Sequence, residues 1–184
     1  MQVRAFLVAC LVVGCTSNET AEPAPACHEE CQDGTAVRAV RETLKLAYNL
    51  TLQGNPVGAQ DETTPCPLGG SVHVFGSASS NPKFGATEVD LTYEIDACHY
   101  LSRDDQPNEN YETTLSGTVT QSGTLAVQPT ATTALVIGSD SLDWTGNVYD
   151  PAIDYAEEGC VLALGQSGNH VSGTWCGREF GFDL

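Results

Sequence analysis

The sequence predicts a mainly β domain of the α+β class, with one curved antiparallel sheet of about seven strands wrapped around a single N-terminal helix. Three observations lead to this expectation. Residues 36–52 have a broad apolar helical face, a period-two pattern begins near residue 70, and glycines fall within several of the expected strands. A curled sheet would give the helix a concave surface to pack on. The alternative is a β-sandwich with the helix on its flank.

The first element is an uncharged apolar run, residues 5–13, which follows Arg4. Nine helical residues span about 14 Å, which is too short for a hydrocarbon core of about 30 Å. A charged start, a short apolar middle and a small residue at the end are the layout of a secretory signal. We therefore expect residues 1–14 to be a signal peptide that the mature protein lacks.

The end of this run, Val12-Val13-Gly14-Cys15, resembles the lipobox of bacterial lipoproteins. The resemblance implies cleavage before Cys15 and acylation of that residue, which would anchor the protein in a membrane. Gly14 fits the pattern, and Val12 stands where the family usually has Leu. Because Thr16 and not Asp follows the cysteine, the resemblance also implies sorting to the outer membrane, facing the periplasm or the cell surface. Residues 15–26 lack large apolar side chains and are expected to form a flexible tether.

Composition restricts the partners of the mature chain. Loss of Arg4 with the signal leaves six bases against 24 acids, a net charge of −18. The long-range field of such a protein repels nucleic acid and anionic lipid headgroups, and it attracts cationic partners or divalent ions. The remaining length suits a single domain, residues 27–184.

The expected helix covers residues 36–52, with Asp33-Gly34-Thr35 as its start and with Gly54 and Pro56 beyond its end. On a helical wheel its apolar residues fill an arc of about 200°. These residues are Leu46, Ala39, Leu50, Ala36, Ala47, Val40, Leu44, Val37 and Tyr48. A polar stripe of about 100° remains for solvent. It holds Arg41, Lys45, Arg38, Asn49 and Glu42.

From residue 70 onward, apolar and polar side chains alternate, as in a half-buried antiparallel sheet. The alternation predicts strands near 70–78, 86–98, 111–121, 132–138, 141–149, 159–165 and 170–182. Glycine inside a strand weakens it unless a bend or a close backbone approach requires it. Gly76, Gly117, Gly146 and Gly173 could therefore bend the sheet, make room for the helix, or mark ordinary β-bulges.

Six cysteines follow Cys15, and an even number in an exported chain predicts disulfides. A hairpin centred near residue 82 would place Cys66 opposite Cys98, and a turn near Gly168 would place Cys160 opposite Cys176. Opposed residues of antiparallel strands lie within disulfide range. By elimination, Cys27 and Cys31 are expected to pair locally.

Four stretches resemble chemical sites, but each departs from the required pattern. The CHEEC cluster, residues 27–31, lacks the second pair of ligands that a structural zinc site needs. Residues 165–169, GQSGN, fail the G-x-S-x-G pattern and fit a hairpin turn better. The acidic stretches 103–110 and 150–158 lack the calcium-loop order, although weak Ca²⁺ binding is allowed there. We therefore expect no catalytic residues, no structural metal and no cofactor.

The folded part of the chain is similar to acidic, Gly/Thr-rich lipoproteins of Gram-negative bacteria. The similarity rests on PCPLGGSVHV at 65–74, on Cys98 and on SGTWCGR at 172–178, and it implies no activity. The expected function is a non-catalytic, lipid-anchored envelope lipoprotein with a structural or partner-binding role. Two rivals are a carrier of a hydrophobic ligand and a secreted hydrolase. A hollow concave side would favour the carrier, and a filled one would favour the binding protein.

Overall fold

The computed structural model describes residues 26–53, 57–81, 83, 85–128 and 131–184. Over these ranges the chain forms one helix, a short 3-10 turn and a single antiparallel sheet of eight strands, in which each strand pairs with the next along the chain. The elements are α1 (Glu29–Thr51), β1 (Gly58–Pro65), β2 (Ser71–Asn81), β3 (Ala86–Ser102), η1 (Pro107–Glu109), β4 (Tyr111–Ala126), β5 (Ala134–Val148), β6 (Ile153–Ser167), β7 (His170–Trp175) and β8 (Arg178–Asp183). Within the described ranges, no helix is both long enough and apolar enough to cross a membrane.

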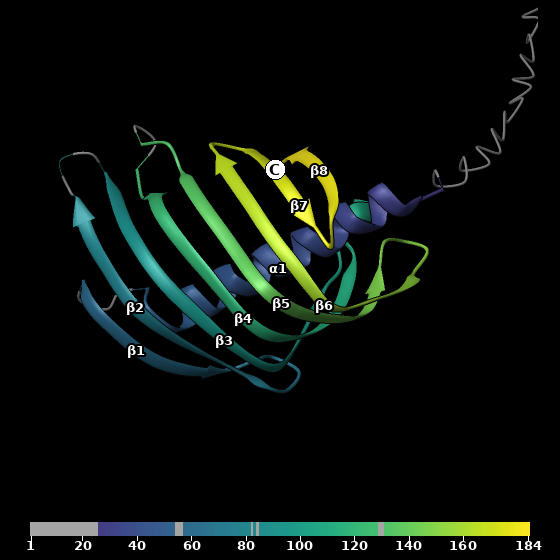
Figure 1. Cartoon of the computed structure of the whole chain (residues 1–184), viewed down its shortest axis with the longest axis horizontal. Helices are drawn as coiled ribbons and strands as arrows, with labels where there is room; N and C mark the ends of the chain where they lie inside the picture. The colour runs from purple at the N-terminus through teal and green to yellow at the C-terminus, as the bar shows by residue number, and fades with distance from the viewer. Residues whose placement is uncertain (1–25, 54–56, 82, 84, 129–130) are drawn as a thin grey trace, which may run out of the picture.

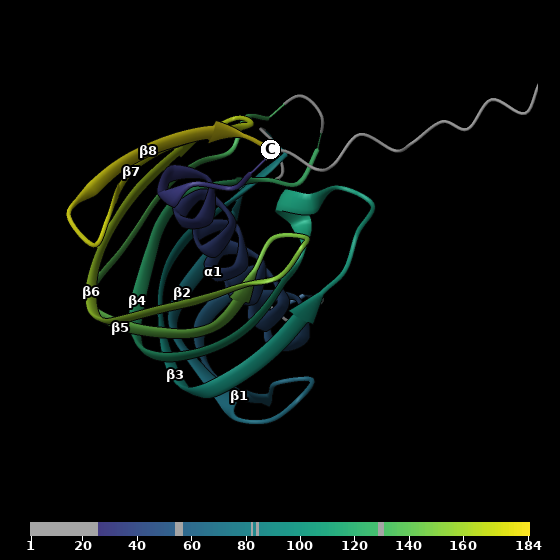
Figure 2. The same ribbon diagram turned by 90° about the vertical axis from the view of Figure 1, so that its right-hand side faces the viewer.

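The sheet is open and strongly curved, with β1 and β8 at its two edges (Figure 1). Helix α1 lies on the concave side, and Figure 2 shows the strands curving past it. One apolar core joins the inner side chains of the strands to the buried face of the helix. The mainly β architecture with one helix agrees with the sequence, whereas the sandwich alternative is wrong because all eight strands belong to one sheet.

About seven strands were expected and eight are observed, and the expected strands differ from the observed ones at three places. β1, with the sequence GAQDETTP, is exposed along almost all of its length. It therefore carries no alternation of apolar and polar residues, the signal that revealed the other strands. Its pairing with β2 is made by backbone groups, which the sequence pattern does not report.

The other two errors concern strand boundaries. The expected strands 132–138 and 141–149 are one strand, β5, which continues through a register shift between Ser139 and Leu142. The expected strand 170–182 is instead a hairpin, β7 and β8. Cys176 and Gly177 have positive φ angles of 49° and 80° and form its two-residue turn, so Trp175 pairs with Arg178.

Helix α1 begins at Glu29, seven residues before the expected first residue. Glu29 and Glu30 stand in its first turn, where carboxylates favour the positive end of the helix dipole. Thr35, which the sequence suggested as part of the start, is instead inside the helix. Its hydroxyl donates to the backbone carbonyl of Cys31 at 3.0 Å. Asp33 is also internal, and its charge is matched by a partner on β8.

The deepest helical residues are Val40, Leu44 and Ala47, which are 0%, 2% and 2% exposed. This placement confirms the expectation that these three side chains lie in the concavity. The predicted apolar arc was nevertheless too wide, because Leu50 is 55% exposed. Two residues of the predicted solvent stripe are also less exposed than expected, since the side chains of Arg38 and Arg41 are only 12% and 13% accessible.

The period-two pattern of β3 is confirmed. Val89, Leu91, Tyr93 and Ile95 are all buried, and the acidic residues between them are exposed. The acidic stretch 150–158 was expected to be a loop, but β6 starts at Ile153 and takes up most of it. GQSGN forms a hairpin turn, as expected, with Ser167 paired to His170.

Glycines of the strand interiors allow neighbouring backbones to approach closely. Gly146 has a φ of 144°, and a Cβ added to it would lie 1.9 Å from the carbonyl oxygen of Glu112 on β4. Gly173 has a φ of 153°, and its added Cβ would lie 2.0 Å from the carbonyl oxygen of Ala163 on β6. At these two positions the space next to glycine is taken by an adjacent strand, not by the helix.

Candidate functional site

Three disulfides join the six cysteines, in the same pairs that the sequence suggested. They are Cys27–Cys31, Cys66–Cys98 and Cys160–Cys176, with Cα–Cα separations of 5.2, 5.4 and 4.7 Å. Cys27–Cys31 closes the first turn of α1, so both thiols of the CHEEC cluster are bonded to each other. Cys15, the expected lipidation site, lies outside the described residues.

The strand register behind two of these pairs differs from the expected one. Val72 pairs with Ile95, which centres the β2–β3 hairpin between residues 83 and 84 and not near 82. Cys66 belongs to the turn between β1 and β2. That turn is held against β3 by two backbone hydrogen bonds, from Leu68 to His99 at 3.2 Å and from His99 to Gly69 at 2.9 Å. The turn, and not a strand position, brings Cys66 to Cys98.

Cys176 is likewise not directly opposite Cys160. Leu162 pairs with Trp175, so the backbone of Cys176 faces Val161, whose carbonyl oxygen accepts a hydrogen bond from the Cys176 N–H at 3.0 Å. Cys176 is the first residue of the β7–β8 turn. Because its φ is 49°, its side chain does not follow the inward–outward alternation of the strand. The side chain then reaches the inner face, where it bonds to Cys160.

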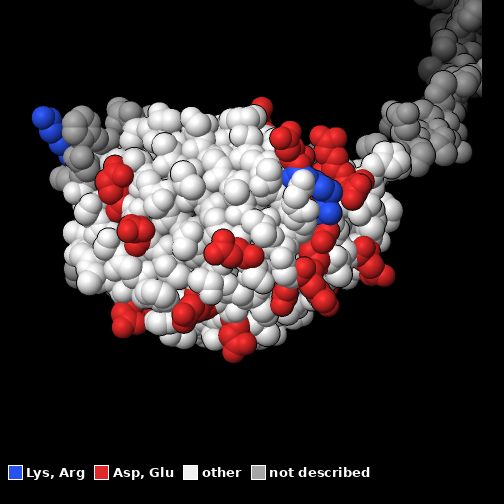
Figure 3. All heavy atoms as spheres, viewed as in Figure 1, with Lys and Arg blue, Asp and Glu red and all other residues white. Residues whose placement is uncertain are grey.

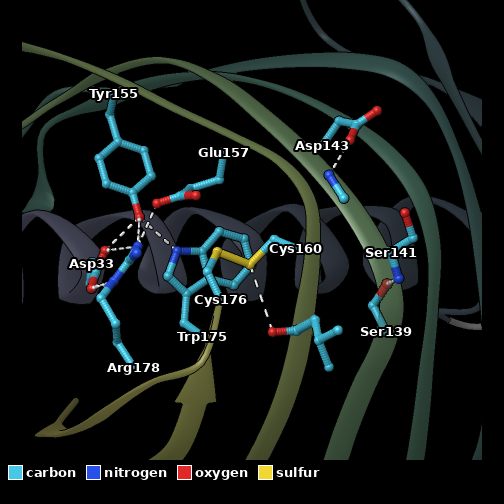
Figure 4. Close-up of a disulfide and its surroundings, with 12 residues drawn as sticks. Asp33, Ser139, Ser141, Asp143, Tyr155, Glu157, Cys160, Trp175, Cys176 and Arg178 are labelled. Atoms are coloured by element: carbon cyan, nitrogen blue, oxygen red, sulfur yellow. Dashed lines mark hydrogen bonds and ion pairs between the residues drawn. A yellow bond between two sulfur atoms is a disulfide. The ribbon is translucent and has the colours of Figure 1, made fainter.

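A polar network next to this disulfide joins the start of α1 to β6, β7 and β8 (Figure 4). We call it the Asp33 network. Its members are Asp33, Tyr155, Trp175, Arg178 and Glu157. Asp33 is buried, with its side chain 5% accessible. It accepts hydrogen bonds from the Tyr155 hydroxyl at 2.5 Å and from Nε and Nη2 of Arg178 at 2.6 and 2.9 Å.

The other members of the Asp33 network are also hydrogen-bonded to one another. The indole N–H of Trp175 donates to the Tyr155 oxygen at 2.6 Å, and Arg178 also pairs with Glu157. Burial raises the pKa of Tyr155, and its hydrogen bond to Asp33 raises it further. Hydrogen bonding to Asp33 raises the pKa of Arg178. Tyr155 therefore stays neutral and Arg178 stays charged at physiological pH, which suits a fixed link between helix and sheet better than proton transfer.

A groove of about 560 Å³ lies beside the last turns of α1. We call it the helix-end groove. The opposite wall comes from the ends of β2 to β5, and Val57, Gln60 and Gln166 complete it. Its apolar lining consists of Tyr48, Leu52, Val57, Ala78, Leu125, Ala126, Val127 and Leu135. Val57 and Val127 are 54% and 68% exposed, so apolar side chains remain open to solvent here.

Both charged residues that line the helix-end groove are basic, namely Arg41 and Lys45. Nη2 of Arg41 donates to Oε1 of Gln166 at 3.0 Å, while Nε of Arg41 is buried and has no hydrogen-bond partner among the described residues. Burial lowers the pKa of Arg41. Lys45 bonds to Glu42 at 3.0 Å, and the Lys45 side chain is 63% accessible.

Comparisons of the chain with protein-family models, with curated proteins and with solved structures give no match. Function therefore has to be inferred from the residues and their geometry.

The outer face of the sheet, which points away from α1, is strongly acidic. On β3 it carries Glu88, Asp90, Glu94 and Asp96, all of them exposed. Figure 3 shows acidic side chains spread over the face in view, with basic ones at only two places. Within the described residues, no group of three or more His, Cys, Asp or Glu side chains is arranged to hold a metal ion.

His73 lies among the acids of the outer face. Its Nε2 lies 2.7 Å from Asp61 on β1, and its Nδ1 lies 3.2 Å from Glu94 on β3. The hydrogen bond to Asp61 raises the pKa of His73, and the hydrogen bond to Glu94 raises it further. The three residues link adjacent strands, and each ring nitrogen already has a carboxylate partner.

Sequence reasoning missed both the Asp33 network and the helix-end groove. Asp33 and Arg178 are 145 residues apart in the chain, and no spacing rule connects them. The groove did leave a signal, because Arg41 and Lys45 were recognised as part of one polar helical stripe. That stripe could be assigned to solvent or to a ligand only once the sheet opposite it was known.

Proposed function

We propose that the protein is a non-catalytic, lipid-anchored lipoprotein of the outer membrane that binds a cationic partner in the cell envelope. The observation that carries the binding role is the packing of α1. Its side chains pack into the concave face, so the acidic outer face of the sheet is left free for a partner. The lipid anchor is supported by the sequence from Arg4 to Cys15.

The anchor predicts a clear effect of replacing Cys15. We expect Cys15→Ala to remain unprocessed and to take up no radioactive palmitate when it is expressed in a Gram-negative host, because the acylated thiol is absent. The native protein should be labelled and should sediment with outer membranes. Cys10→Ala, which changes a residue of the expected signal peptide, is the matched control and should behave like the native protein. Equal labelling of Cys15→Ala would contradict the anchor.

The partner surface can be tested with a photoreactive residue at Thr120, which is exposed on the outer face. Thr120 pairs with Thr92 on β3, between the positions opposite Asp90 and Glu94. We expect crosslinks to an envelope partner whose yield falls severalfold when Asp90→Asn and Glu94→Gln are combined, because a cationic partner loses its attraction. The yield should also fall with added salt.

The control removes the same charge elsewhere. Asp154→Asn combined with Glu158→Gln changes two exposed acids of β6. It should leave the Thr120 crosslinks unchanged. An equal loss in both double variants would mean that only net charge matters, and the absence of crosslinks at Thr120 would contradict the outer face as the binding surface.

A second candidate function is favoured by the helix-end groove. The concave side is filled along most of α1 but is open beside the last turns of the helix, where apolar residues are exposed. This observation supports a carrier of a hydrophobic ligand. The two functions are compatible, because they use opposite faces of the sheet.

A further inference from the structure

We propose that the helix-end groove holds one single-chain anionic amphiphile, a long-chain carboxylate with its alkyl tail along the apolar wall and its head beside Arg41 and Lys45. This inference deepens the carrier function named above as the second candidate. It is independent of partner binding on the outer face.

The volume and the apolar walls of the groove suit an alkyl tail. About 560 Å³ lies within the range of roughly 300–1,000 Å³ that is usual for small-molecule sites. Leu52 and Leu135 form its floor at 5% and 6% exposure, and Val57 and Val127 stand open at its rim. One narrow chain can cover these residues, whereas the two chains of a phospholipid would need considerably more room.

The charged residues at the groove favour an anionic head. The chain has 24 acids and only seven bases, yet the two charged side chains that line the groove are both basic. Glu42 lies next to them, 3.0 Å from Lys45 and 4.0 Å from Arg41. It offsets part of their charge but is not a lining residue. An anion in the groove would therefore contact two cationic side chains that line it, whereas the carboxylate of Glu42 is outside the lining.

Arg41 supplies a second reason for an anionic head. Its side chain is 13% accessible, and its Nε is buried without a hydrogen-bond partner among the described residues. A buried donor without an acceptor is unfavourable. A carboxylate is an acceptor-only group that can bind a guanidinium through two parallel hydrogen bonds. The Lys45 side chain is 63% accessible, so it has room to turn toward the same head.

The probe for the test is palmitate that carries a photoreactive diazirine at the end of its chain. The lipid-anchored protein is reconstituted in phosphatidylcholine vesicles, labelled and digested, and adducts are mapped by mass spectrometry. We expect adducts on Leu52, Leu125 or Leu135. The methyl ester of the same probe has no charge, and we expect it to label these residues about tenfold less.

Substitutions separate the tail from the head. Val127→Asp places a carboxylate on the apolar rim and should reduce groove labelling about tenfold. Its matched control is Val161→Asp, at a 52% exposed valine of β6 outside the groove, which should label normally. Combining Arg41→Gln with Lys45→Gln should reduce palmitate labelling to the level of the ester. Lys83→Gln with Arg103→Gln removes the same charge outside the groove and should have no effect.

Three results would overturn the inference. Equal labelling by palmitate and its methyl ester would exclude recognition of the anionic head. Equal loss in Val127→Asp and Val161→Asp, or no adducts at the groove residues, would exclude the groove as the site. If Arg41→Gln impairs folding, Lys45→Gln alone still tests the head, because its side chain is exposed. None of these results would affect the Thr120 crosslinks, so failure here leaves the partner-binding proposal standing.

Discussion

Replacing Leu44 by alanine is expected to lower the free energy of unfolding by about 2–5 kcal/mol, the usual range for truncating a buried leucine. Leu44 is 2% exposed and belongs to the core between α1 and the sheet. The curved strands on the other side of it are fixed by their ladders, so the site cannot easily collapse around the cavity. Urea unfolding of the oxidised protein, followed by the fluorescence of the buried Trp144 and Trp175, measures the change.

Lys45 is the adjacent control for Leu44. Its side chain is 63% accessible and makes one surface ion pair with Glu42. Lys45→Ala should therefore change stability by less than about 1 kcal/mol. If Leu44→Ala were as mild as Lys45→Ala, the helix would not be packed into the concavity. The acidic outer face would then lose its main support as the binding surface.

Much of the fold was predictable because burial leaves a periodic trace in the sequence. Over much of β3 and β4, inner residues alternate with outer ones, since a sheet packed on one face requires that pattern, and the alternation breaks where the register shifts. The deep helical positions Val40, Leu44 and Ala47 were found for the same reason. β1 was missed because an exposed edge strand needs only backbone partners.

Two of the three cysteine pairs, Cys66–Cys98 and Cys160–Cys176, were predicted correctly from a register that is wrong. A disulfide tolerates a range of Cα separations, so an error of a few positions did not change the partners. The turns that bring the sulfurs together depend on local backbone angles, such as the positive φ of Cys176. A pattern of apolar residues contains no information about such angles.

The candidate sites were less predictable than the fold. Asp33 was taken as part of a helix start, because its partner Arg178 lies at the far end of the chain. The helix-end groove is formed by one helix and the ends of several strands, and no local motif describes it. Both features depend on how the fold brings together residues that are distant in the chain, and a single sequence gives little direct information about this.

Replacing Gly146 by alanine is expected to destabilise the protein by about 3 kcal/mol or more. At a φ of 144° any other residue is strained, and such backbone strain costs about 1–3 kcal/mol. The added methyl group would also lie 1.9 Å from the Glu112 carbonyl oxygen, so β4 and β5 would have to separate locally. Urea unfolding measures this effect in the same way as for Leu44.

Gly138 on the same strand is the matched control. A Cβ at Gly138 would find its nearest neighbour, the carbonyl oxygen of Leu162, at 3.5 Å, which is an ordinary contact. Gly138→Ala should therefore stay within about 1 kcal/mol of the native protein, or stabilise it slightly by restricting the unfolded chain. Similar losses at both positions would mean that glycine is needed along β5 in general. A large loss confined to Gly146→Ala would show that close contact with β4 requires glycine at this position, as the geometry predicts.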